Sequence, residues 1–165
     1  ALTKLSGEGQ GFEVVINIQG DEPFIDPEQI DLLAQMFRQK NLQIGTLIKP
    51  VKNAEKLASP NVVKVVISNS SKALYFSRSV IPYVRSSNQE NLLKNQAYYA
   101  HVGMYGYRAG ILREIVRLSP GVLEQAESLE QLRWLEHGYD IHTQLTHAES
   151  LAVDTPEDLS KIINI

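Results

Sequence analysis

The stretch Glu13 to Gln19, EVVINIQ, is short, mostly apolar and rich in Val and Ile, and Gly20 and Pro23 follow it. An apolar run of this length bounded by turn residues is typical of a buried parallel strand. Residues 27 to 40 begin with a proline, which suits a first helical turn, and carry apolar side chains at helical spacing. A second strand-like run covers residues 44 to 48. This β-α-β order predicts an α/β fold with a parallel sheet.

The pattern changes after this unit. Two strand-like runs, 62–67 and 73–76, flank Asn69-Ser70-Ser71, which is a hairpin signal. A polar loop is expected over 86–96 and an aromatic-rich, alternating strand over 98–107. The following elements are helices over 109–118 and 128–137, strands over 141–145 and 151–153, and a last helix with Thr155 as N-cap and Pro156 at N1. We therefore expect one α/β domain, residues 1–165, that carries an inserted antiparallel portion.

The composition excludes several classes of protein. Of 165 residues, 43% are hydrophobic, which suffices for one core. The net charge of −3 argues against a nucleic-acid partner. The absence of cysteine excludes a disulfide framework, a Cys-ligated zinc site and a thiol nucleophile. No apolar run approaches the roughly 18 residues of a spanning helix, and no signal peptide opens the chain, so a cytoplasmic protein without a membrane partner is expected.

Two carboxylates are candidates for a metal site. Asp21 ends the first predicted strand, and Asp154 ends a short strand just before the last helix. Ligands in open α/β sheets gather outside the carboxyl ends of strands, and Mg²⁺ prefers one or two carboxylates together with phosphates and water. The alternatives are a plain turn at Asp21 and a favourable helix-dipole interaction at Asp154.

The segment HVGMYGYR offers a candidate ligand wall. His101, Tyr105 and Tyr107 share one face of the predicted strand. Glycines weaken a strand unless something approaches closely, so Gly103 and Gly106 suggest a ligand beside His101. The alternative is a structural histidine with tyrosine hydroxyls at the surface.

Two other segments carry polar candidates. Arg78 follows the strand 73–76, where its guanidinium could pair bidentately with a carboxylate, although a surface arginine is the alternative. Glu130 and Gln131 flank apolar helix positions and could bind a polyhydroxylated ligand, although a solvated helix face is the alternative.

Taken together, the chain resembles the 3-deoxy-manno-octulosonate (Kdo) cytidylyltransferase family, in segments that cover nearly all of Glu13 to Ile163. The matching segments are VVINIQGDEPFIDP, NVVKVVIS, ALYFSRSVIP, HVGMYGYR, ESLEQLRWLEHG and VDTPEDL. The resemblance implies a Rossmann-like nucleotide-diphospho-sugar transferase fold with a mixed sheet. It also implies an antiparallel insertion, residues 62–107, that shapes the sugar site and helps form a homodimer.

The implied reaction joins CTP and Kdo, with Mg²⁺, to give CMP-Kdo and pyrophosphate for lipopolysaccharide biosynthesis. The resemblance makes Asp21 and Asp154 the catalytic magnesium ligands. It places six further residues in the acid-sugar pocket: Gln19, Arg78, His101, Tyr105, Glu130 and Gln131. The family's Gly/Arg/Ser/Lys-rich triphosphate loop has no counterpart here, so we expect the C-terminal two-thirds of the enzyme, inactive by itself.

Three other interpretations compete with this one. An N-acylneuraminate cytidylyltransferase would use the same chemistry on a nine-carbon acid sugar, but HVGMYGYR and EQLRWLEHG favour Kdo. The fragment could instead act as a non-catalytic sugar-binding or dimerisation module. A metal-dependent phosphatase would need a second acid two residues after a nucleophilic aspartate, which Asp21-Glu22-Pro23 does not supply.

Overall fold

The computed structural model describes residues 11–18, 25–85 and 92–148. The strands are β1 (Val14–Ile18), β2 (Ile44–Pro50), β3 (Lys64–Ile67), β4 (Ala73–Ser77), β5 (Tyr99–Arg108) and β6 (Ile141–Leu145). The helices are α2 (Pro27–Met36), α3 (Ala54–Ala58), α4 (Leu92–Asn95), α5 (Ala109–Ile115), α6 (Val122–Glu127) and α7 (Gln131–Glu136). The predictions for Gln19, Asp21, Asp154, the strand over 151–153 and the last helix lie outside the described residues.

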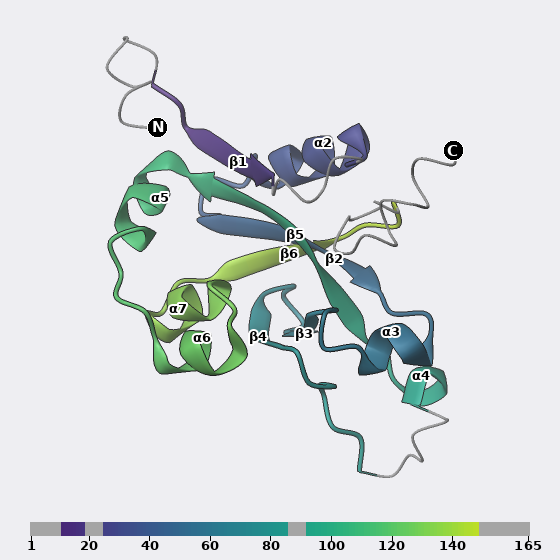
Figure 1. The fold of residues 1–165 in the computed structure, drawn as a ribbon. Helices are drawn as coiled ribbons and strands as arrows, with labels where there is room; N and C mark the ends of the chain where they lie inside the picture. The colour runs from purple at the N-terminus through teal and green to yellow at the C-terminus, as the bar shows by residue number, and fades with distance from the viewer. Residues whose placement is uncertain (1–10, 19–24, 86–91, 149–165) are drawn as a thin grey trace, which may run out of the picture.

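Strand β5 is the centre of a six-stranded mixed sheet (Figure 1). One edge of β5 pairs antiparallel with β2, and the other edge pairs antiparallel with β1 near Arg108 and with β3 near Tyr99. Strand β6 runs parallel to β2. Strands β1, β2 and β6 therefore run in one direction, as the β-α-β pattern predicts, but β5 separates the first two. The predicted α/β fold with a mixed sheet is confirmed.

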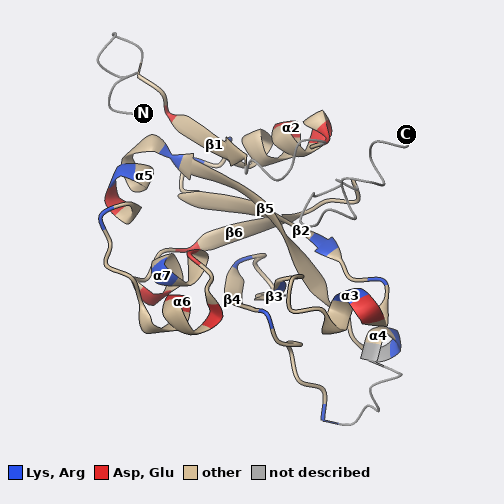
Figure 2. Cartoon of the chain, in the orientation of Figure 1, with Lys and Arg blue, Asp and Glu red and all other residues tan. Residues whose placement is uncertain are grey.

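The helices cover both faces of this sheet, and charged residues stay mostly on the helices and connecting segments (Figures 1 and 2). On one face, α2 packs Leu33 and Met36 against Val102 and Met104 of β5. On the other face, α7 contributes Leu132 and Trp134 to a core with Tyr105 and Tyr107. The alternation predicted along β5 therefore divides its side chains between two cores.

Helix α2 begins as its sequence predicts. The Asp26 carboxylate accepts a hydrogen bond from the Glu28 amide at 2.9 Å, and Pro27 occupies the first turn. The helix ends at Met36, four residues earlier than predicted. Arg108 donates to the carbonyls of Phe37, at 2.6 Å, and Gln39, at 3.1 Å, just beyond that end. A side chain distant in sequence thus provides the C-terminal cap.

The antiparallel hairpin of β3 and β4 confirms the Asn69-Ser70-Ser71 turn signal. The loop predicted over 86–96 is wrong for residues 92–95, which form α4, and neither α3 nor α6 was predicted. These helices have only four to six residues, too few for a 3.6-residue apolar period to stand out. In the part of the chain that the structure describes, no helix has the length and apolarity to cross a membrane.

The portion over residues 62–107 pairs its strands antiparallel, but it shares β5 with the main sheet. It is therefore an extension of one sheet. Its assignment as a sugar-site and dimerisation portion stays a prediction.

Gly106 is explained by the helix packed against β5 and not by a ligand. A Cβ built at Gly106 would overlap the ring of Phe37, which is itself 6% exposed. A side chain does approach the backbone closely at Gly106, as the glycine indicates, but that side chain is Phe37 and not a ligand. The interpretation of Gly106 as part of a ligand wall is therefore wrong.

Gly106→Ala is expected to destabilise the protein by about 1–3 kcal/mol, because the added methyl overpacks a filled core. Urea unfolding measures the change. Gly110→Ala in α5 is the matched control: its Cβ would meet nothing within 4 Å, and alanine favours a helix by about 1 kcal/mol over glycine. Equal effects of the two substitutions would contradict the Phe37 explanation.

Candidate active site

His101 is oriented by Thr46 of the neighbouring strand β2. The Thr46 hydroxyl lies 2.9 Å from His101 Nε2 and 2.7 Å from the carbonyl oxygen of Met104. A hydroxyl has one proton, and the carbonyl can only accept, so Thr46 donates to Met104 and accepts from Nε2–H. The ring is then the tautomer with a free lone pair on Nδ1, which makes no hydrogen bond with a described residue. His101 can therefore accept a hydrogen bond from a hydroxyl group.

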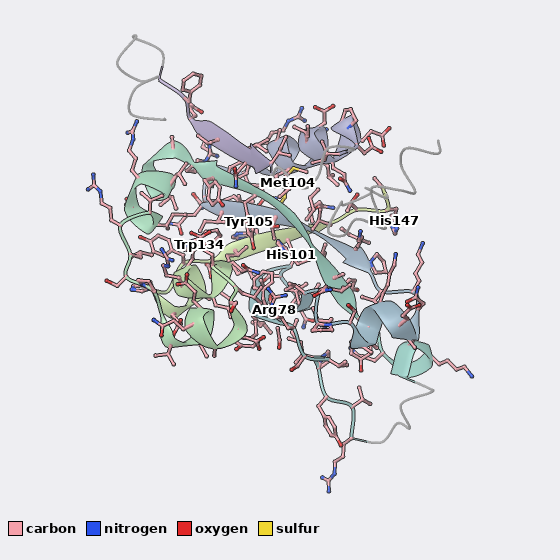
Figure 3. The ribbon with its side chains drawn as sticks, in the orientation of Figure 1. Arg78, His101, Met104, Tyr105, Trp134 and His147 are labelled. Carbon is pink, nitrogen blue, oxygen red and sulfur yellow. The ribbon has the colours of Figure 1, made fainter. Side chains whose placement is uncertain are left out.

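Five side chains form what we call the aromatic wall: Phe76, His101, Tyr105, Tyr107 and Trp134. Ring centroids are 5.3 Å apart for Phe76 and His101 and 5.0 Å apart for His101 and Tyr105. The indole of Trp134 packs edge-on against both tyrosines, at 5.0 and 5.5 Å. Figure 3 shows His101, Tyr105 and Trp134 between β5 and the α6–α7 pair, whereas Met104 lies toward α2. Four of these side chains are at most 5% exposed, so the wall is part of the buried core, and His101 is its one partly exposed member.

The hydroxyl of Tyr105 is buried and has no hydrogen-bond partner among the described residues. Burial raises the pKa of Tyr105 well above its ordinary value, and Tyr107 and the negative charge of Glu130 act in the same direction. The hydroxyl therefore stays protonated. A buried hydroxyl without a partner costs about 1–3 kcal/mol, so a ligand that reached it would recover a hydrogen bond.

Glu130 and Gln131 approach the wall from the start of α7. Glu130 is exposed, and its charge also raises the pKa of Tyr107, whose own burial is the larger cause. Gln131 is only 7% exposed, and its amide makes no hydrogen bond with any residue that the structure describes. Glu130 is thus near the two tyrosines, and Gln131 follows it at the start of α7 with an amide that can still form hydrogen bonds.

Arg78 is largely engaged with backbone carbonyls. Its Nε donates to Glu127 O at 2.9 Å, Nη1 to Pro60 O at 3.0 Å and Nη2 to Ser128 O at 3.4 Å. Three of its five N–H donors are thus used, and two remain. The structure therefore joins Arg78 to the segment that precedes Glu130. It does not leave the guanidinium free.

A pocket of about 350 Å³ lies at the carboxyl ends of β2 and β6, lined in part by Lys49, Ala100 and His147. Lys49 pairs with Ala100, whereas His101 pairs with Ile48, and neighbours along a strand point to opposite faces. This pocket is therefore separate from the aromatic wall.

The metal prediction cannot be placed, because Asp21 and Asp154 lie outside the described residues. Within residues 11–18, 25–85 and 92–148, no group of three or more His, Asp and Glu side chains could hold a metal ion.

Sequence reasoning missed Thr46 and Trp134. Thr46 carries no motif and is completely buried, so only the strand register shows its bond to His101. Trp134 is the single tryptophan of the chain and could have been noticed for that reason. Apolar helix positions predict burial in general, but not which strand they contact.

Acid is expected to destabilise the protein through His101. Burial lowers the pKa of His101 to about 3, whereas an unfolded chain binds this proton near pH 6.5. Between these values the unfolded state holds more protons, so stability falls as the pH falls, by up to about 1.4 kcal/mol per pH unit. Urea unfolding from pH 7 to pH 4 measures this slope.

His101→Gln should flatten that slope without abolishing it, because burial also lowers the pKa of His142. His137→Gln, at an exposed position, is the control and should keep the wild-type slope. A His101→Gln slope as steep as the wild type would contradict the assignment.

Two solved structures of nucleotidyltransferases resemble this chain. The putative glucose-1-phosphate thymidylyltransferase from Bacillus anthracis shares the fold, with a TM-score of 0.55 at 18% identity over 96% of this chain and 56% of that one. A much closer match is the structure of CMP:2-keto-3-deoxy-manno-octonic acid synthetase complexed with CTP. Its TM-score is 0.83 at 39% identity, over 96% of this chain and 63% of that one.

The cytidylyltransferase family model matches residues 4–141, and the chain belongs to this family. Relatives named 3-deoxy-manno-octulosonate cytidylyltransferase include that of Parabacteroides distasonis, 48% identical over 94% of this chain and 63% of the relative. The protein of that name from Cytophaga hutchinsonii is 49% identical over 92% and 60%. The chain thus spans a little under two thirds of these relatives' length.

Proposed function

We propose that this chain serves an enzyme that transfers the cytidylyl group of CTP to Kdo, giving CMP-Kdo and pyrophosphate for lipopolysaccharide biosynthesis. The observation that carries the proposal is the unpaired, buried hydroxyl of Tyr105, whose ring centroid lies 5.0 Å from that of His101 with its free lone pair. A polyhydroxylated sugar supplies both donors and acceptors, so it can satisfy both groups. The names of the relatives support Kdo as that sugar.

In this proposal the described residues bind and orient the sugar. His101 Nδ1 accepts from a sugar hydroxyl, and the Tyr105 hydroxyl and the Gln131 amide provide further hydrogen bonds. The two N–H groups that remain on Arg78 suit the sugar carboxylate. Transfer of a nucleotidyl group depends mainly on such positioning and on neutralisation of charge.

We further propose Asp21 and Asp154 as magnesium ligands, with Gln19 in the sugar pocket. Magnesium held by these carboxylates would neutralise phosphate charge and make the attacking sugar hydroxyl more acidic. A homodimer in the cytoplasm completes the proposal.

A substrate panel tests the function. Pyrophosphate release is measured for the full-length protein with CTP and magnesium, with Kdo and N-acetylneuraminate offered separately. Release with Kdo alone is expected. Release with N-acetylneuraminate alone would mean the nine-carbon sugar is the substrate, and release with neither, from folded protein, would favour a non-catalytic sugar-binding module.

Tyr105→Phe should separate stability from sugar recognition. Removing an unpaired buried hydroxyl is expected to leave the protein as stable as before or about 1 kcal/mol more stable. The KM for Kdo should rise about 2- to 13-fold, since a lost hydrogen bond is worth about 0.5–1.5 kcal/mol. Urea unfolding and steady-state kinetics measure the two effects. A KM equal to that of the wild type would remove Tyr105 from the sugar site.

A further inference from the structure

Glu127 connects the end of α6 to the end of β4. Its Oε1 accepts a hydrogen bond from Ser77 Oγ at 2.6 Å, and its Oε2 accepts one from the Arg78 amide at 2.9 Å. Ser77 is only 2% exposed. Each oxygen of the Glu127 carboxylate thus accepts a hydrogen bond at the end of β4, one from Ser77 and one from the next residue. These two bonds together hold the side chain of Glu127 in place.

Arg78 adds hydrogen bonds from its side chain to the backbone at the end of α6. Its guanidinium donates to the carbonyls of Glu127 and Ser128, so side chain and backbone of the two segments bind each other reciprocally. Ser128 has φ 54° and ψ 49°, the left-handed region that a residue with a Cβ enters at a cost of about 1–2 kcal/mol. Such a conformation persists where neighbouring contacts hold it.

The turn at Ser128 is followed directly by the candidate sugar-binding residues. Ser128 is followed by Leu129, which is 6% exposed, and then by Glu130 and Gln131. The register of this short segment therefore depends on where the turn at Ser128 is fixed. Displacing it would move the Gln131 amide and the Glu130 carboxylate relative to Tyr105.

Two basic side chains, those of Lys64 and Arg78, surround Glu127. Burial lowers the pKa of Lys64, while the negative charge of Glu127 opposes that shift. Lys64 pairs with Ser77 across the hairpin, so its cationic side chain and that of Arg78 both lie near this carboxylate. A neutral side chain at position 127 would lose this electrostatic support.

We propose that Glu127 is a positioning residue for sugar binding: it fixes Arg78 and the turn at Ser128, and thereby places Glu130 and Gln131 against the aromatic wall. This inference rests on the proposed function. Glu127 makes no contact with the sugar in this proposal, and its effect is transmitted by the residues that it orders.

Glu127→Ala in the full-length protein is expected to raise the KM for Kdo about tenfold while leaving the KM for CTP within about twofold. Glu127→Gln keeps an acceptor for Ser77 but presents an amide toward the Arg78 N–H, so its effect should be intermediate. Glu55→Gln, an exposed charge change in α3, is the control and should match the wild type. A structural role alone would lower the thermal midpoint without separating the two KM values.

A double-mutant cycle tests the mechanism of the effect. Because Glu127 acts partly through Arg78, the Arg78→Ala, Glu127→Ala pair should raise the KM for Kdo by less than the product of the single effects. The proposal would be overturned if the double variant raised the KM for Kdo by the full product of the two single effects. Equal increases in the KM for CTP and for Kdo would also overturn it. So would wild-type values in a folded Glu127→Ala variant.

Hydrogen exchange separates this inference from the proposed function, because it needs no substrate. Glu127→Ala should accelerate amide exchange over residues 128–131 and leave β2 unchanged. Absence of Kdo-dependent activity in the wild type would reject the proposed function, whereas unchanged exchange would reject the ordering role of Glu127 whatever the substrate is.

Discussion

Asp21→Asn is expected to reduce turnover of the full-length protein by about a thousandfold. The proposed role of Asp21 is to hold magnesium, and a metal ion contributes several kcal/mol to stabilising charge in a phosphoryl-transfer transition state. Each 1.36 kcal/mol is a factor of ten in rate. Asparagine keeps the size of the side chain but loses the negative charge that attracts the cation, so the fold should survive while the chemistry is lost.

Turnover is measured as pyrophosphate release over a magnesium titration. If metal affinity is the cause, raising the magnesium concentration should recover part of the lost activity of Asp21→Asn. Asp154→Asn should behave in the same way. Near-normal turnover in both variants would remove the metal assignment.

Asp26→Asn provides a matched control five positions away. Asp26 caps α2 through its bond to the Glu28 amide, and asparagine is an equally good N-cap. The same change of charge should therefore leave turnover and stability nearly unchanged. A large loss of turnover in this control would mean that net charge near β1, and not a specific ligand, controls the reaction.

The elements with strong local patterns could be predicted from the sequence. The proline-led helix α2 and the alternation of β5 each carry a period that local residues determine. The apolar run of β1 predicted a strand correctly, but the expectation of a buried parallel strand is wrong, because β1 pairs antiparallel with β5 and Ile18 is 40% exposed. The position of β5 between β1 and β2 could not be predicted, because antiparallel pairing with both strands depends on contacts between residues far apart in sequence. The C-terminal cap supplied to α2 by Arg108 has the same origin.

The candidate site shows the same division. Thr46 pairs with Tyr105, and the next residue of β2, Leu47, pairs with Val102, so β5 has two extra residues at this irregularity. Because two is an even number, His101 and Tyr105 stay on the same face of the sheet. A skip of one residue would have reversed the faces. The shared face is thus confirmed, whereas its role as a ligand wall stays a prediction. Arg78 illustrates what sequence leaves out. A strand-ending arginine can face a ligand or bind carbonyls, and only the nearby turn at Ser128 decides how many donors remain.

Lys64→Ala is expected to destabilise the protein by about 2–5 kcal/mol, in the range for removing a long buried side chain. Lys64 is completely buried, and its Nζ donates to the carbonyls of Ser59, at 2.7 Å, and Val62, at 2.6 Å. Alanine removes both bonds and leaves a cavity beneath the hairpin. Lys64→Met fills that cavity and leaves only the carbonyls unpaired, so it should cost less, about 1–3 kcal/mol. Urea unfolding at pH 7 measures both, and equal losses would show that the ammonium bonds and not the packed stem stabilise this region.

Comparing the wild type with Lys64→Met also shows how the charge of Lys64 affects the pH dependence of stability. Burial lowers the pKa of Lys64 below its ordinary value of 10.5, so over the alkaline range below pH 10.5 the unfolded state binds more protons than the folded state. The stability of the wild type relative to Lys64→Met should therefore rise with pH across that range. Buried tyrosines such as Tyr105 oppose this trend above pH 10, because their raised pKa values remove stability as the pH rises, but both proteins contain them and the difference cancels their effect. A constant difference would mean that Lys64 titrates alike in both states, and that burial of its ammonium is compensated in full by the two carbonyls and by Glu127.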